Sequence, residues 1–214
     1  MAFSNPAADA VLAEYADRIE AEHRRMAEEG EAMFAHLDEL LLPVGPAVGW
    51  FLHSLVLARR PARVLELGTS YGYSTLFLAD AVKQVGGTLI TMDLAAYKQA
   101  YARERLTTAG LADAVEFRTG DAVEMIAADP GRFDLVLLDI WKDLYVPCLN
   151  AFHPKLSDEA IVAADNMIEP ERARADARAY RAAVRALPDM QSALLPIGSG
   201  IELSVKWAAG NAKL

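Results

Sequence analysis

The hydrophobic positions of this chain follow two different periods, and the change from one to the other divides the sequence. From about Ala7 to Glu29, apolar residues recur every three or four positions among charged ones, which is the spacing of an amphipathic helix. The same spacing continues to Leu41. After that, short apolar runs alternate with helical stretches. Because strands that alternate with helices form a mostly parallel sheet covered on both faces, the pattern predicts an α/β fold.

The alternation predicts seven strands and the helices between them. The expected strands cover residues 63–67, 88–92, 115–119, 134–138, 160–164, about 190–196 and 200–207. The expected helices of this part cover residues 49–59, 73–85, 96–109, 121–128, 143–151 and 171–187. We expect one domain over residues 1–214, with residues 1–45 as a helical lid or dimerisation segment and residues 46–214 as the α/β core.

Composition narrows the classes of function. The formal net charge of −9 and pI near 4.9 disfavour nucleic acid as a partner. A single cysteine, Cys148, excludes an internal disulfide and suits a reducing compartment. The apolar run Val44 to Ala58 is too short to span a bilayer, and the first residues lack the apolar core of a secretory signal. We therefore expect a cytoplasmic protein that does not bind a membrane.

Three oxygen-bearing side chains follow two of the predicted strands. Asp139 comes directly after the run 134–138, and Asp165 and Asn166 come directly after the run 160–164. Because parallel strands end at the same edge of a sheet, these side chains are expected to meet there. Carboxylate and amide oxygens suit a hard divalent cation. The sequence therefore predicts a metal site.

A glycine turn follows the first predicted strand of the core. Gly68 and Gly72 stand between the strand that carries Glu66 and a helix, an arrangement that lets a ligand approach the backbone. The spacing G-x-x-x-G differs from the dinucleotide-binding fingerprint. The next strand ends at Asp93, which is placed to accept hydrogen bonds from both ribose hydroxyls of a nucleoside. These features predict a site for an adenosine cofactor.

The motifs VLELGTSYGYS, LLDIWKDLY and AADNMI, taken in this order, resemble those of the cation-dependent catechol O-methyltransferases and their caffeoyl-CoA O-methyltransferase relatives. The resemblance runs from about Leu40 to Trp207. It implies a Rossmann-like methyltransferase fold with seven strands ordered 3-2-1-4-5-7-6, the last one antiparallel. It also implies S-adenosylmethionine as the cofactor and Mg²⁺, or another divalent cation, as the metal.

The resemblance also implies a role for individual residues. Lys142 matches the general base of the family, and Asp139, Asp165 and Asn166 match its metal ligands. The expected cofactor-binding residues are Val44, Glu66, Gly68, Gly72, Ser74, Asp93, Asp121, Ala122, Asp139 and Trp141. The expected substrate-binding residues are Leu40, Trp141, Lys142, Asn166 and Pro170.

The chain departs from the family pattern where the second hydroxyl of a catechol is held. Ala193 or Leu194 stands where a glutamate is expected, and Glu202 is nearby but out of register. Ile140 replaces a histidine beside the adenine. These departures leave open which acceptor binds and which hydroxyl is methylated.

Three hypotheses follow for function. The first is a Mg²⁺-dependent O-methyltransferase that acts on a small aromatic diol. The second is an NAD(P)-dependent oxidoreductase, which is opposed by the missing third glycine and by the lack of a Tyr-x-x-x-Lys pair; Tyr101 has no lysine four residues later. The third is a binding protein that keeps the fold without catalysis.

Two further features have simpler interpretations. The arginines of the last helix alternate with an apolar face, so we interpret them as a solvated surface. They are Arg172, Arg174, Arg178, Arg181 and Arg185. Apolar residues of the N-terminal helices, Met33, Phe34 and Leu37, would favour a homodimer if they are exposed.

Overall fold

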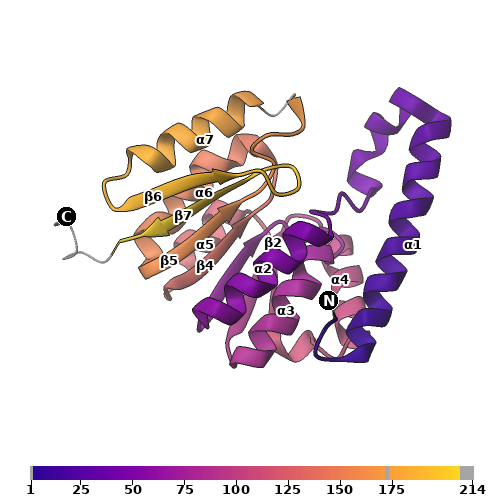
Figure 1. Cartoon of the computed structure of the whole chain (residues 1–214), viewed down its shortest axis with the longest axis horizontal. Coiled ribbons are helices and arrows are strands. Elements are labelled where there is room, and N and C mark those ends of the chain that lie inside the picture. Colours follow the sequence, from indigo (N-terminus) through magenta and orange to yellow (C-terminus); the bar gives the residue numbers. More distant parts are fainter. Residues whose placement is uncertain (1, 172–173, 208–214) are drawn as a thin grey trace.

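The computed structural model describes residues 2–171 and 174–207, which form a seven-stranded sheet between two layers of helices (Figure 1). The strands are β1 Arg63–Leu67, β2 Thr88–Asp93, β3 Val115–Thr119, β4 Phe133–Leu138, β5 Leu156–Ala164, β6 Met190–Leu195 and β7 Ile201–Lys206. The α-helices are α1 Pro6–Glu29, α2 Pro46–Arg59, α3 Tyr73–Val85, α4 Ala96–Thr108, α5 Ala122–Ala128, α6 Tyr145–Phe152 and α7 Arg174–Ala186. The short 3₁₀ segments are η1 Gly30–Glu39, η2 Ala112–Ala114, η3 Lys142–Leu144 and η4 His153–Lys155.

The strands lie in the order β3-β2-β1-β4-β5-β7-β6. Strands β1 to β5 pair in parallel, and β7 runs antiparallel to both of its neighbours. The predicted α/β fold class, strand order and direction of the last strand are therefore confirmed. Strand β7 reverses because only the short turn after Leu195 links it to β6, and a parallel return would need a long crossover.

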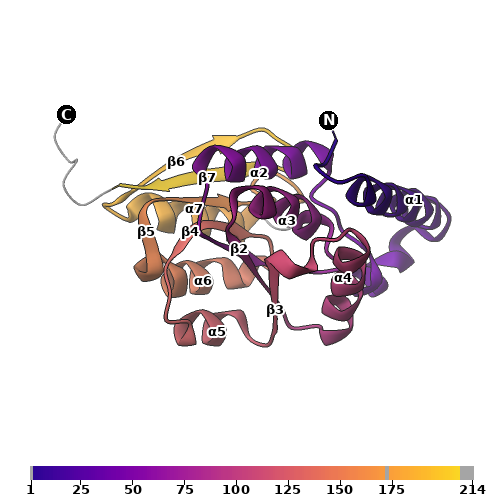
Figure 2. The ribbon, with the colours of Figure 1, turned by 90° about the horizontal axis from the view of Figure 1, so that it is seen from below.

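The sheet separates two hydrophobic cores (Figure 2). Successive side chains of a strand point to opposite faces, so in β1 Val64 joins one core and Leu65 the other. Helices α1, α2, α3 and α4 cover the first face, and α5, α6 and α7 cover the second. Because the core strands are buried on both faces, their sequences are almost continuously apolar.

Besides shifts of helix ends by up to three residues, two elements differ from the sequence prediction. Residues 30–39 form the 3₁₀ segment η1 and do not continue the first helix, because Gly30 ends α1 with a positive φ of 58°. Strand β5 begins at Leu156, four residues earlier than predicted, and its register shifts between the pairs Phe133/Leu156 and Leu135/Ile161. The early part of β5 is polar, so its sequence does not show the apolar run of a buried strand.

The N-terminal segment forms an arm along one side of the sheet (Figure 1). Helix α1 buries Val11 and Tyr15 in the first core. The side chains of Met33 and Phe34 lie outside what the structure describes, so the expected homodimer stays a prediction. Arg172 lies between the two described ranges. None of the described helices combines the length and apolar character that crossing a membrane requires.

Candidate active site

Four neighbouring parallel strands end at the same edge of the sheet. The ends of β2, β1, β4 and β5 are aligned, because Leu67 pairs with Met92 and Leu138, and Leu138 pairs with Ala164. The residues at or just after these ends are Asp93, Gly68, Asp139 and Asp165. The register therefore brings the predicted cofactor turn and the predicted metal ligands to one edge, as expected for parallel strands.

A cavity of about 710 Å³ opens at this edge. Eleven of the predicted site residues line it: Val44, Gly68, Ser74, Asp93, Asp121, Ala122, Asp139, Trp141, Lys142, Asn166 and Pro170. Four predicted site residues do not line it: Leu40, Glu66, Gly72 and Asp165. These four residues are buried, and each is surrounded by other residues and not by the cavity.

The two glycines of the turn serve different purposes. A Cβ on Gly68 would lie 2.0 Å from the carbonyl oxygen of Asp139, and the φ of Gly68 is 104°, so only glycine fits there. Gly72 also has a positive φ, of 89°, but the space that it leaves is occupied by Ala102 and the Tyr15 hydroxyl. That hydroxyl donates a 2.6 Å hydrogen bond to the Tyr71 carbonyl. Gly72 thus allows α1 and α4 to support the turn from behind.

Glu66 lies fully buried beneath the turn. Its carboxylate accepts hydrogen bonds from the hydroxyls of Ser74, Thr75 and Thr91, at 2.6, 2.7 and 2.6 Å. Burial raises the pKa of Glu66 to about 7, although these hydrogen bonds act in the opposite direction. Glu66 therefore organises the base of the cofactor turn, and Ser74 connects it to the cavity.

Asp93 holds the glycine turn from the end of β2. One carboxylate oxygen accepts from the backbone N–H of Ser70 at 2.8 Å, and the other accepts from that of Ala95 at 2.8 Å. Each oxygen keeps a further lone pair toward the cavity that Asp93 lines. Asp121, by contrast, caps α5 by accepting from the N–H of Glu124. Asp121 therefore caps α5 and lines the cavity at the same time.

The predicted metal ligands meet at the ends of β4 and β5. Asp165 is 1% exposed, and its Oδ1 has no hydrogen-bond partner. Burial, followed by repulsion from Asp139, raises the pKa of Asp165 to about 7. Asn166 adopts a left-handed φ of 57° and lines the cavity. An unpartnered buried carboxylate oxygen beside a second carboxylate is unfavourable without a cation, so these residues fit one.

The candidate ligand set consists of two carboxylates and the amide of Asn166. Among the residues that the structure describes, no three His, Cys, Asp or Glu side chains are grouped closely enough to hold a metal ion. A cation here would thus be held by Asp139, Asp165 and the Asn166 amide oxygen, with the remaining positions open. Open positions are what a cation needs in order to bind a substrate as well as the protein.

Lys142 lies beside the candidate metal ligands. Its Nζ donates to the Tyr145 hydroxyl at 2.5 Å and to the Ile140 carbonyl at 3.0 Å, and it lies 3.4 Å from Asp139 Oδ1. The Tyr145 hydroxyl is fully buried and lies within hydrogen-bonding distance of the Leu138 carbonyl, at 3.0 Å. Tyr145, which the sequence analysis did not single out, thus fixes the position of Lys142 in the cavity.

The N-terminal arm supplies one wall of the cavity. Asp38 accepts from Lys98 Nζ at 2.6 Å and from the Tyr97 hydroxyl at 2.5 Å, which ties η1 to α4. Leu40 is buried, and the wall is formed by Leu41, Leu42, Pro43 and Val44 instead. Lys98 and Asp38 were missed because no local pattern marks them. Their pairing joins residues 60 positions apart in the chain.

Large apolar side chains stand at the mouth of the cavity. Leu42, Leu94 and Trp141 line it and are 49%, 64% and 57% exposed. Only Trp141 was singled out from the sequence. Such exposure of apolar side chains around a cavity is typical of sites that bind an apolar or aromatic ligand.

Comparison with known proteins agrees with this geometry. A family model described as a methyltransferase domain matches residues 65–167. The chain is 31% identical over 131 residues to the catechol O-methyltransferase of Niastella koreensis, covering 59% of this chain and 59% of that enzyme. The chain spans about half the length of other curated relatives that it matches.

Two solved structures share the fold. A putative O-methyltransferase from Klebsiella pneumoniae is 25% identical, with a TM-score of 0.74 over 96% of this chain and 91% of that one. The O-methyltransferase from Bacillus cereus, solved in complex with SAH, is 24% identical, with a TM-score of 0.69 over 76% of this chain and 81% of that one. The comparisons give the oxidoreductase alternative no support. Over the matched residues the chain is therefore similar to a methyltransferase domain and to catechol O-methyltransferase, and it has the Rossmann-like methyltransferase fold that its motifs predicted.

Proposed function

We propose that this protein is an S-adenosylmethionine-dependent O-methyltransferase that uses Mg²⁺ and methylates one hydroxyl of a small aromatic diol. The observation that carries the metal part is the buried, unpartnered Oδ1 of Asp165 beside Asp139, at the edge of a cavity that Lys142 also lines. The relatedness to O-methyltransferases supports the methyl-transfer part.

The cofactor half of the cavity has the features that an adenosine sulfonium needs. Gly68 brings the backbone close to the ligand, and Asp93 offers acceptors for ribose hydroxyls. Asp121 and Ala122 line the cavity beyond Asp93, where the adenine would lie. The cofactor has no pyrophosphate, which agrees with a turn that is surrounded by acidic residues. When bound, S-adenosylmethionine would supply an electrophilic methyl group on a positively charged sulfur.

The metal half would prepare the acceptor. Asp139, Asp165 and Asn166 would hold a divalent cation, whose chemistry is to stabilise an ionised hydroxyl at neutral pH. Lys142, in its neutral form, would accept the hydroxyl proton, and the position of its Nζ beside Asp139, Tyr145 and the Ile140 carbonyl supports this role. Asn166, Lys142 and Trp141 line the same cavity and would contact the acceptor there.

The remaining task of the protein is positioning. Because a sulfonium methyl donor and an ionised hydroxyl carry opposite charges, methyl transfer between them would gain most from fixed geometry and exclusion of water. The wall formed by residues 41–44 and the apolar side chains at the mouth serve this purpose. Glu202 takes no part, because it is fully buried and bonded to Arg181 and Arg185. The residue that holds the second hydroxyl is thus not Glu202.

A methylation assay tests the proposal. Purified protein is incubated with S-adenosylmethionine and a panel of catechol and caffeate acceptors, with Mg²⁺ or with EDTA, and the product is followed by mass spectrometry. We expect a mass increase of one methyl group that requires the metal. The same turnover in EDTA would remove the metal from the mechanism, and no product with any diol would remove the acceptor class.

A further inference from the structure

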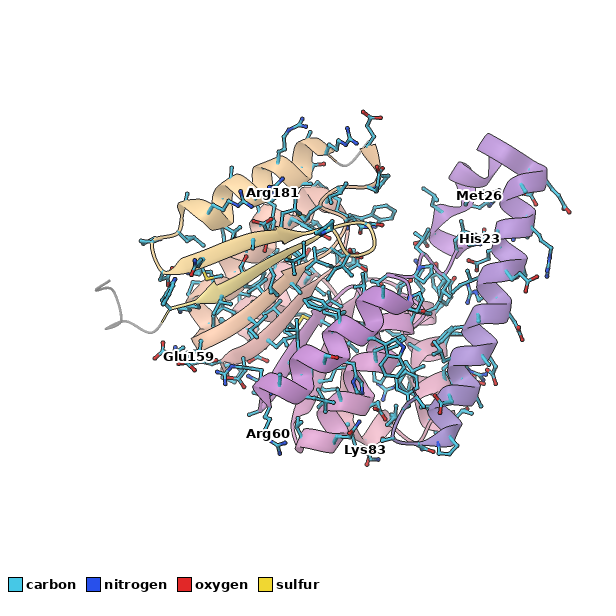
Figure 3. All side chains as sticks on the ribbon, in the orientation of Figure 1. His23, Met26, Arg60, Lys83, Glu159 and Arg181 are labelled. Carbon is cyan, nitrogen blue, oxygen red and sulfur yellow. The ribbon has the colours of Figure 1, made fainter. Side chains whose placement is uncertain are left out.

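A second cavity, of about 240 Å³, is lined by residues other than those of the candidate active site. It is lined by Met167, Ile168, Arg174, Arg178, Arg181 and Leu194, and we call it the arginine pocket. The arginines come from α7, the two residues 167 and 168 follow the candidate metal ligand Asn166, and Leu194 comes from β6. Arg181 can be located on α7 in Figure 3.

The lining of the arginine pocket is positively charged and has no acidic member. Among the described residues of the sheet, Glu202 is the carboxylate that bonds to a lining arginine: it is fully buried and accepts from Arg181 Nε at 3.1 Å, and also from Nε of the neighbouring Arg185 at 2.7 Å. Arg174 pairs with Glu169 and Glu171, which are largely exposed, so these pairs are weak.

Much of the donor capacity in the pocket remains available. Only the Nε of Arg181 is used by Glu202, which leaves its two terminal nitrogens. Among the described residues, none accepts a hydrogen bond from Arg178. Guanidinium groups with unused forked donors that line one cavity offer an anion paired, charge-assisted hydrogen bonds. Arg174 and Arg178 are exposed, which agrees with the solvated surface that the sequence suggested, whereas Arg181 is half-buried and bonded to Glu202.

The arginine pocket shares a wall with the candidate active site. Asn166 and Pro170 line the large cavity, and Met167 and Ile168, which lie between them in the chain, line the arginine pocket. This wall is held firmly, because the N–H groups of residues 167, 168 and 169 donate to the carbonyls of Gly200, Ser199 and Ser199 at 2.9, 2.9 and 3.0 Å. A group bound at the arginines therefore lies beside the segment that would hold the acceptor.

We propose that the arginine pocket binds an oxyanion, a carboxylate or a phosphate monoester, on a molecule whose apolar part packs against Met167, Ile168 and Leu194. Planar guanidinium groups bind both oxyanions through paired hydrogen bonds. The anion comes either from a substituent of the methyl acceptor or from a separate effector. Only the first source rests on the proposed function.

A binding experiment tests the pocket itself. The full chain is titrated calorimetrically with benzoate, phenyl phosphate and, as the neutral match, benzyl alcohol. We expect the two anions to bind one per chain, and Arg178→Gln to weaken them about tenfold or more, the effect of losing a charged hydrogen-bond pair. Arg60→Gln, a change on the exposed end of α2 far from the pocket, serves as the control (Figure 3).

The binding result decides the proposal. Because Arg178 is exposed, its substitution leaves the core intact, and circular dichroism and Tm of the variant check this. Anion affinity equal to that of benzyl alcohol, or equal in wild type and Arg178→Gln, would overturn the proposal. This readout needs no turnover, so it stands even if no diol is methylated.

Kinetics then identify the source of the anion. If the acceptor carries it, Arg178→Gln raises KM for 3,4-dihydroxybenzoate about tenfold and leaves KM for catechol unchanged. If a separate effector carries it, benzoate changes the turnover of catechol in the wild type without competing with it, and this effect disappears in Arg178→Gln.

Discussion

The two halves of the active-site cavity differ in how completely their polar groups are satisfied. On the cofactor side, Glu66 and Asp93 accept five hydrogen bonds from surrounding hydroxyl and N–H groups. On the metal side, two carboxylates repel each other and Asp165 Oδ1 has no partner. The carboxylates of the cofactor side are satisfied within the protein, whereas on the metal side Lys142 pairs with Asp139 and leaves Asp165 Oδ1 without a partner. This difference teaches that unsatisfied polar groups, more than the shape of the cavity, locate where an ion belongs.

The largest expected effect is that of Asp165→Asn. The change removes one repelling charge, so the metal-free protein gains about 1–3 kcal/mol of stability. It also removes a cation ligand, so Mg²⁺ no longer raises Tm and methyl transfer falls by about 1000-fold.

Thermal denaturation with and without Mg²⁺, together with product formation, measures both effects. Asp158→Asn, an exposed position on the same strand, is the control and leaves both unchanged. A variant at Asp165 that keeps the full Mg²⁺ shift in Tm would contradict the proposed ligand set.

Next in size is the effect of Lys142→Met, which keeps the aliphatic stem and removes the amine. We expect kcat to fall by about 100- to 10,000-fold, the range for loss of a general base, while S-adenosylhomocysteine binds with unchanged Kd. Lys83→Met, at an exposed site far from the cavity, is the control (Figure 3). Wild-type kcat in the Lys142 variant would leave the cation alone responsible for removing the proton.

In the metal-free protein, Glu66 on the cofactor side makes the stability depend on pH. The pKa of Glu66 is raised from 4.5 to about 7, so between these values the unfolded chain loses a proton that the folded chain retains. The free energy of unfolding therefore falls as the pH rises from about 4.5 to 7, by at most about 3 kcal/mol for Glu66. Above pH 7 this contribution no longer changes. Asp165, with a pKa also raised to about 7, adds to the same trend.

Urea denaturation at pH 5, 6, 7 and 8 measures this trend. Glu66→Gln is expected to flatten it and Asp165→Asn to flatten it further. Asp129 and Asp80 do not contribute in this window, because their pKa values are lowered and their effect lies at more acidic pH. Equal slopes in wild type and Glu66→Gln would show that Glu66 is ionised in the folded protein.

The smallest expected effect concerns the arm that closes the cavity. Asp38 joins η1 to Lys98 and Tyr97 but is 62% exposed at its side chain, so the pair contributes only about 0.5–1 kcal/mol. We expect Asp38→Ala to weaken S-adenosylhomocysteine binding by about two- to fivefold in calorimetry. Asp17→Ala, at an exposed position on α1, is the control. An unchanged Kd would mean that the arm is held by α1 alone.

Local patterns in the sequence were sufficient to predict most of the strands and helices. Apolar runs and turn residues predicted the strands of the parallel core and the sheet edge that Asp139 and Asp165 share. The motif resemblance predicted the strand order. Strand β5 was predicted too short because residues 157–159 are polar and its register with β4 shifts there. Residues 30–39 were expected to be helical because their apolar spacing does not reveal the turn at Gly30.

The sequence by itself determined which elements form and which residues stand at their ends, because period and turn chemistry are properties of neighbours in the chain. Only the tertiary structure decided that Gly72 makes room for Tyr15, that Tyr145 holds Lys142, and that Glu202 lies beneath the arginines of α7. Most of these contacts join segments that are far apart in sequence, and their energies depend on burial. Neither the distance between two side chains nor the loss of their water is encoded in any local pattern.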